Sequence, residues 1–255
     1  MSDETIVKFF QRHIIPIHFA FQKENDIQNI VVTSFILSVS DHWFLVTAGH
    51  CIRQINELIE RTDVQLVQCQ LIDSLGQGAK HLDPIPFTYR MANPIQLSDD
   101  YAFDYGFIPI SLYYRGLLEK NNVAPLTEAV WKFQPNSVIY YLLMGIPGEL
   151  VKVNPDEIAM TPTLLHVEPV SEKPDGFTDV DAPLFYGRII LDDSIQSIKG
   201  MSGGPIFAFQ KYENGDVKYF LTALQSRWNP YSYHIAACPV ELLGNFLESL
   251  IASID

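Results

Sequence analysis

Short apolar runs separated by turn-forming residues dominate this sequence of 255 residues. The runs are rich in valine, isoleucine, leucine and aromatic residues, which is typical of β-strands. Many short strands at this spacing predict an all-β fold built as a barrel or a sandwich. The runs interpreted as strands are 14–21, 30–38, 43–47, 64–72, 105–110, 137–144, 164–170, 188–191, 206–209, 219–225 and 235–237.

Two segments instead place apolar residues at helical spacing, residues 52–61 and residues 240–254, the second directly after Pro239. The stretch 111–129 predicts a crossover between two halves of the chain. The acidic, proline-rich stretch 167–187 predicts a long surface loop, either plainly solvated or acting as a lid or docking element near a substrate cleft.

Composition narrows the classes of partner. A net charge of −13 argues against nucleic acid or an anionic membrane surface as the ligand. No apolar run approaches the roughly 18 residues of a transmembrane helix. The three cysteines Cys51, Cys69 and Cys238 are sparse and odd in number, and the first residues lack a secretory pattern, so we expect a cytoplasmic protein.

Three sequence contexts carry candidate chemistry. Ser202 lies in Gly200-Met201-Ser202-Gly203-Gly204-Pro205, a tight turn that can expose a hydroxyl beside free backbone N–H groups. His50 follows the apolar strand 43–47, and Asp104 opens the strand 105–110. The order histidine, aspartate, serine is one of the known orders of a Ser-His-Asp triad.

Each of these residues also has an ordinary structural reading, and only their conjunction favours catalysis. His50 would act as the base that activates the Ser202 hydroxyl, and Asp104 would orient the imidazole. The N–H groups of Gly200 and Ser202 would form the oxyanion hole. Asp99 and Asp100 are rival aspartates, although neither opens an apolar strand.

These residues resemble the trypsin-like (chymotrypsin-fold) serine peptidases over most of the chain. Thr47-Ala48-Gly49-His50-Cys51 is similar to the histidine motif of that family, and the turn around Ser202 matches its Gly-x-Ser-Gly-Gly-Pro pattern. The resemblance implies two antiparallel six-stranded β-barrels and a C-terminal helix. Residues 1–115 would form the barrel that carries His50 and Asp104, and residues 116–255 the barrel that carries Ser202.

The resemblance also implies a substrate pocket. Gln196 would lie at its floor with Ser197 beside it, Gln225 on its wall, and Ser226 would hydrogen-bond to the aspartate. No acidic residue falls at the floor, so a preference for arginine or lysine is not expected. Lys199 near the entrance would favour an acidic side chain, unless it is simply solvated.

The chain departs from the family in two places. Met201 stands where secreted members have an aspartate that binds a freshly cut N-terminus, so activation by that route is not expected. Cys51 has no cysteine on the preceding strand with which to pair. The site would therefore form without processing, or be ordered by a partner or ligand.

Two other hydrolase classes fit less well. An α/β-hydrolase would use Ser202, Asp216 and His234 in that order, but Gly203-Gly204-Pro205 is a poor helix start. The histidines lack metal-ligand spacing, so no metal or cofactor is expected. The sequence thus predicts a serine endopeptidase acting on protein or peptide substrates, selective or activated by a protein partner. The alternative is a catalytically silent peptidase fold that binds proteins.

Overall fold

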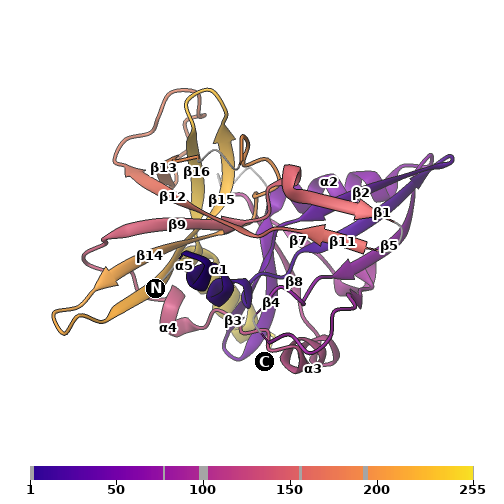
Figure 1. Ribbon diagram of the computed structural model, residues 1–255, viewed down its shortest axis with the longest axis horizontal. Coiled ribbons are helices and arrows are strands. Elements are labelled where there is room, and N and C mark those ends of the chain that lie inside the picture. Colours follow the sequence, from indigo (N-terminus) through magenta and orange to yellow (C-terminus); the bar gives the residue numbers. More distant parts are fainter. Residues whose placement is uncertain (1–2, 77, 98–102, 155–156, 192–194, 255) are drawn as a thin grey trace.

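A computed structural model describes residues 3–76, 78–97, 103–154, 157–191 and 195–254 of the chain (Figure 1). Its first half contains two antiparallel sheets. One has the order β2-β1-β5-β6, formed by β1 (Ile17–Lys23), β2 (Asp26–Val32), β5 (Gln65–Leu71) and β6 (Ile85–Pro86). The other has the order β3-β4-β8-β7, formed by β3 (Phe35–Val39), β4 (His42–Ala48), β7 (Ile95–Gln96) and β8 (Tyr105–Pro109).

The expectation of a closed first barrel is not met, because these two sheets stay open. The run 30–38, predicted as one strand, is broken at Thr33 and Ser34 into β2 and β3, which belong to different sheets. Within the described ranges, a single bridge between Ile14 and Phe35 forms near this break. One bridge is not a ladder, so the sheets are joined mainly by side-chain packing in a shared core.

The second half forms a closed six-stranded barrel, as the resemblance implies. Its order is β12-β13-β16-β15-β14-β9, and its neighbouring strands are antiparallel. The strands are β9 (Tyr140–Gly145), β12 (Thr163–Val170), β13 (Phe185–Ile189), β14 (Pro205–Lys211), β15 (Val217–Asn229) and β16 (His234–Pro239). The predicted loop 167–187 therefore begins and ends in strands, which leaves residues 171–184 between β12 and β13.

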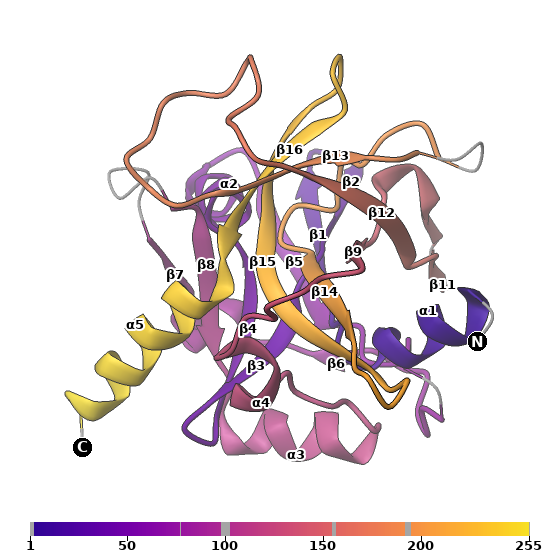
Figure 2. The same ribbon diagram turned by 90° about the vertical axis from the view of Figure 1, so that its left-hand side faces the viewer.

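Both predicted helices are present, as α2 (Gly49–Glu60) and α5 (Val240–Ala252), and Figure 2 shows α5 leading away from the end of β16. Three further helices were not expected: α1 (Asp3–Gln11), α3 (Leu112–Lys120) and α4 (Glu128–Trp131). The last two occupy the predicted crossover. The hairpin of β10 (Val151–Asn154) and β11 (Glu157–Met160) was also missed.

The largest hydrophobic cluster joins the two halves. It contains Phe35 and Phe107 from the first half and Phe207 and Leu224 from the barrel. Helix α1 joins it through Phe10, whose ring centroid lies 4.5 Å from that of Phe207. Because burial of such large rings is strongly favourable, this cluster fixes the two halves against each other. No helix in the described ranges is both long and apolar enough to cross a membrane.

Candidate active site

His50 stands where strand β4 turns into helix α2. The preceding Gly49 is required there, because a Cβ atom would lie 2.9 Å from both Asp104 Oδ1 and the Tyr105 carbonyl oxygen. Strand β4 pairs with β8 so that Ala48 lies opposite Tyr105. This register brings the start of β8, and with it Asp104, next to the imidazole.

Asp104 is buried and holds His50 through two hydrogen bonds. The His50 backbone N–H donates to Oδ1 at 2.7 Å, and the ring Nδ1 lies 2.6 Å from Oδ2. The Ser226 hydroxyl donates to Oδ2 at 2.6 Å, as the sequence predicts. The Asp104 backbone N–H donates to Cys238 Sγ at 3.3 Å, so the barrel holds the carboxylate through Ser226 and the backbone of Asp104 through Cys238.

The two groups shift each other's pKa in opposite directions. Burial raises the pKa of Asp104. The hydrogen bonds and charge of His50, together with the hydrogen bond from Ser226, lower the pKa by more than burial raises it, so the net pKa lies below the usual range. Burial lowers the pKa of His50, but the hydrogen bond and the charge of Asp104, together with the neighbouring Cys51 side chain, outweigh burial, and the net pKa is raised. The resting site therefore favours a carboxylate beside a readily protonated imidazole.

The Ser202 turn depends on its glycines. Gly200 has φ +97° and Gly203 has φ +90°, a region that side chains disfavour. A Cβ atom on Gly203 would lie 2.2 Å from Thr47 Oγ1, so the turn packs directly on strand β4 of the other half. The Gly203 N–H donates to the Gln225 carbonyl at 2.8 Å, and the Gly204 N–H to the Met201 carbonyl at 2.9 Å.

The predicted oxyanion donors are unengaged. In the described part of the chain, no acceptor receives the backbone N–H of Gly200 or of Ser202. The Gly200 carbonyl accepts the Thr33 hydroxyl at 2.7 Å, and the same hydroxyl accepts the Ile146 N–H at 3.1 Å. Thr33 thus fastens the turn through the Gly200 carbonyl and leaves the N–H groups of Gly200 and Ser202 available to a ligand.

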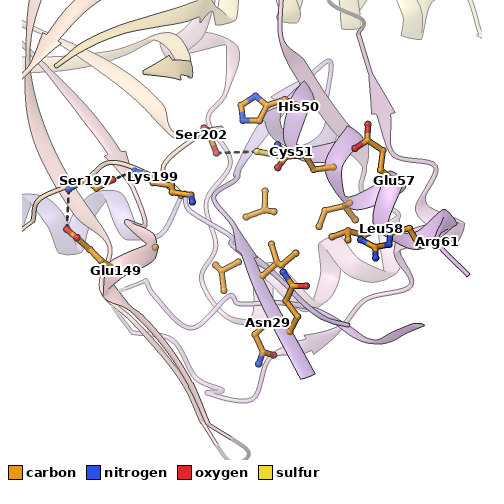
Figure 3. Close-up of a pocket in the computed structure, with 18 residues that line it drawn as sticks. Asn29, His50, Cys51, Glu57, Leu58, Arg61, Glu149, Ser197, Lys199 and Ser202 are labelled. Carbon is orange, nitrogen blue, oxygen red and sulfur yellow. Dashed lines mark hydrogen bonds between the residues drawn. The ribbon is translucent and has the colours of Figure 1, made fainter. Parts of the chain in front are cut away.

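His50 and Ser202 face one cavity of about 1040 Å³. Figure 3 shows the two side chains as neighbours at its edge, with Cys51 beside them. No hydrogen bond joins the imidazole to the serine hydroxyl among the described residues. The Cys51 thiol lies 4.0 Å from the Ser202 carbonyl oxygen. All three cysteines are free, as expected for Cys51.

The predicted specificity residues lie in different settings. Gln196 is exposed, and its backbone N–H donates to Glu149 Oε1 at 2.7 Å. Ser197 lines the cavity, and its hydroxyl accepts the Lys199 N–H at 3.1 Å. Gln225 is buried, and its Oε1 has no partner among the described residues. Their roles as a pocket floor and wall remain predictions.

A second cavity, of about 850 Å³, lies on the other side of His50. Asp104 and Ser226 line it together with Phe177 of the loop 171–184, Trp228 of β15 and Tyr231 of the turn between β15 and β16. This loop therefore reaches the candidate site, in agreement with the lid or docking reading of its sequence. His50 lines both cavities, so an extended ligand lying across both would pass the imidazole.

Sequence reasoning missed the residues that hold this site together, namely Thr33, Glu149 and Cys238. None belongs to a motif, and each acts through a backbone group that only the folded chain brings near. The rivals Asp99 and Asp100 lie outside the described residues. Asp216 lies at the far end of the β14–β15 hairpin from Ser202, which leaves the α/β-hydrolase reading without support.

In the ranges that the structure describes, no group of three or more histidine, cysteine, aspartate or glutamate side chains is placed to hold a metal ion.

Comparison with known proteins places the fold. No protein-family model and no curated protein sequence matches this chain. The solved structure of an inactivated protease paralogue of the scabies mite matches with a TM-score of 0.55 at 13% identity, over 97% of this chain and 96% of that one. The thermostable serine protease AL20 from an extremophilic microorganism matches with a TM-score of 0.50 at 14% identity, over 94% and 98% of the two chains. The chain therefore shares its fold with a serine protease and with an inactivated protease paralogue.

Proposed function

We propose that this protein is a serine endopeptidase that uses Ser202, His50 and Asp104. The observation that carries the proposal is the geometry around His50. Its ring is hydrogen-bonded to the buried Asp104 carboxylate, which also accepts the Ser226 hydroxyl. The ring faces the same cavity as Ser202. An imidazole with one nitrogen on a carboxylate and the other toward a serine is the arrangement of a general base.

In this mechanism the Ser202 Oγ attacks the carbonyl carbon of the peptide bond, and His50 Nε2 takes the hydroxyl proton. The N–H groups of Gly200 and Ser202 stabilise the oxyanion, and each such donor typically contributes about 10²-fold to 10³-fold in rate. The imidazolium then protonates the leaving amine, and an acyl-enzyme on Ser202 remains. Water, activated by His50, releases the second product.

The missing hydrogen bond between His50 and Ser202 fits a site that closes when a substrate or a protein partner binds. Catalytic hydrogen bonds are often long in unliganded enzymes and tighten in the complex. The three free thiols support a reducing compartment such as the cytoplasm. In that compartment a narrow substrate range or an activating partner would protect other proteins.

A fluorophosphonate probe tests the proposal directly. We expect covalent labelling at Ser202 in the wild type, and loss of labelling in Ser202→Ala and in His50→Ala. Profiling of new N-termini, wild type against Ser202→Ala, then identifies the bonds that are cut. Absence of labelling, with candidate partner proteins and peptides present, would reject the enzyme.

The alternative is a catalytically silent protein-binding module. Two observations favour it: the unformed bond between His50 and Ser202, and the inactivated paralogue that shares the fold. Under this alternative, protein partners captured by the wild type would be recovered uncut.

A further inference from the structure

The large cavity runs along the free edge of strand β2. Five consecutive residues of this strand line it, Gln28 to Val32, so both faces and the edge of the strand contribute. Strand β2 pairs with β1 on one side, and no described strand pairs with its other side. In an antiparallel pair every second residue directs its N–H and C=O away from its partner. The cavity therefore meets unpaired backbone groups.

The opposite wall comes from helix α2 and from the loops beside the Ser202 turn. Ile55 and Leu58 of α2 face the cavity together with Ile30 of β2, and all three pack on the core of the first half. Lys199 and Glu149 form the side nearest Gly200. The Glu149 carboxylate already accepts the N–H groups of Gln196 and Ser197, so this side is fixed in place (Figure 3).

The part of β2 that lines the cavity, Gln28 to Val32, carries no charge, proline or bulge that would protect its edge. Natural sheets usually blunt a free edge with lysine, proline or a bulge, because an open edge attracts other strands. Strand β2 reads Asp-Ile-Gln-Asn-Ile-Val-Val, without lysine or proline, and its register with β1 is unbroken. An open, apolar edge beside a candidate nucleophile is the kind of surface that β-strand addition uses.

We infer that the substrate segment on the β2 side of the scissile bond binds as an added strand on this edge. The inference rests on the proposed function, because the same cavity contains His50, Gly200 and Ser202. Main-chain hydrogen bonds to β2 would supply affinity without regard to sequence. The wall of Ile30, Ile55 and Leu58 would select an apolar side chain within the segment. The substrate class is thus an extended, unstructured region of a protein with an apolar residue next to the cut.

Binding of peptides to the Ser202→Ala protein tests this without any need for turnover. Peptides are selected from a random library on Ser202→Ala, and the dissociation constant of the best one is measured by fluorescence polarisation. Each backbone amide of that peptide is then N-methylated in turn, which removes one donor at a time. Strand addition predicts about tenfold weaker binding at every second amide of one segment and little change at the amides between.

A second measurement addresses the apolar wall. Leu58→Gln in the Ser202→Ala background should abolish selection for an apolar residue at one position. Leu242→Gln, a partly exposed leucine of α5 far from the cavity, is the matched control and should leave selection unchanged. If Leu58→Gln does not fold, the N-methyl series still decides, because it leaves the protein intact.

Three outcomes would overturn the inference. The first is that the library yields no peptide that binds. The second is a bound peptide whose N-methyl series shows no alternation. The third is a dimer that forms through β2 and dissociates when peptide binds, which would assign the edge to a second copy of the chain. Failure of the peptidase itself is seen separately, as absence of fluorophosphonate labelling in the wild type.

Discussion

The hydroxyl of Thr33, in the break between β2 and β3, donates to the carbonyl of Gly200 at 2.7 Å. Thr33 is buried, and its own carbonyl accepts the Thr47 hydroxyl at 2.8 Å. A chain of hydrogen bonds thus runs from strand β4, which ends next to His50, through Thr33 to the turn of Ser202. The break that keeps the first half from closing as a barrel therefore supports the candidate site.

Thr33→Val should loosen the Ser202 turn. The change keeps the shape of the side chain but leaves the Gly200 carbonyl and the Ile146 N–H without a partner, at a cost of about 1–3 kcal/mol of stability. We expect fluorophosphonate labelling to slow about tenfold, measured alongside the free energy of unfolding in urea. Thr33→Ser, which keeps the hydroxyl, is the control. Equal labelling rates in Thr33→Val and wild type would show that the turn does not depend on this bond.

Gly203→Ala should prevent a native fold or destabilise it severely. The methyl group would meet Thr47 Oγ1 at 2.2 Å and the Thr33 carbonyl oxygen at 2.5 Å. Gly215→Ala is a matched control, because Gly215 has φ +89° but open space around it. Its cost should be about 1 kcal/mol, from the left-handed backbone alone. Thermal unfolding of both variants separates the clash from the strain, and similar midpoints would contradict this packing.

The labelling rate should rise with pH, with a midpoint above 6.5. The Asp104 carboxylate raises the pKa of His50 against the opposing effect of burial, and only the deprotonated ring can accept the Ser202 proton. Asp104→Asn removes that carboxylate, so the midpoint should move to lower pH and the maximal rate should fall by about 10⁴-fold. A pH-independent rate in the wild type would exclude His50 as the base.

The same shift has a consequence for stability. Because His50 binds a proton more tightly when folded, its pair with Asp104 stabilises the protein fully below pH 6.5. This contribution is lost as the pH rises through the folded pKa.

His13 should make the protein less stable in mild acid. Burial lowers the pKa of His13 to about 4, although its bond to the Ala124 carbonyl at 2.7 Å opposes this and Arg12 lowers it further. Between pH 6.5 and 4 the unfolded chain binds a proton that the folded chain refuses. Stability present above pH 6.5 is therefore lost as the pH falls, by up to about 3 kcal/mol.

His13→Asn isolates this contribution. The asparagine amide can still donate to Ala124 but does not titrate. The difference in unfolding free energy between wild type and His13→Asn should therefore change across pH 6.5 to 4. A constant difference would mean that His13 has the same pKa in the folded and the unfolded protein, which would contradict the effect of burial. Tyr219 and the rings of Phe9 and Phe10 also face this imidazole.

The sequence predicted the second half of the fold better than the first. The barrel strands are regular apolar runs, which predict strands well, and neighbouring strands such as β14 and β15 pair in antiparallel ladders. In the first half, the continuous apolar run 30–38 is broken at Thr33, where the chain passes from one sheet to the other. The hydrophobic pattern is the same on both sides of the break, so it does not predict the change of sheet. Helix α1 was missed because its stability comes from Phe10 packing on Phe207, a contact between the two ends of the chain.

Local pattern alone named His50, Asp104 and Ser202, because a glycine-rich turn and two strand ends constrain the backbone within a few residues. The tertiary structure decided which side chains and backbone groups surround these three residues. Thr33, Glu149 and Cys238 each bond to the backbone of a residue more than 40 positions away. The open edge of β2 beside the proposed nucleophile Ser202 is likewise a property of sheet order. Periodicity reports which side chains are buried, whereas the pairing of edges and the partners of buried carbonyls depend on how distant strands pack.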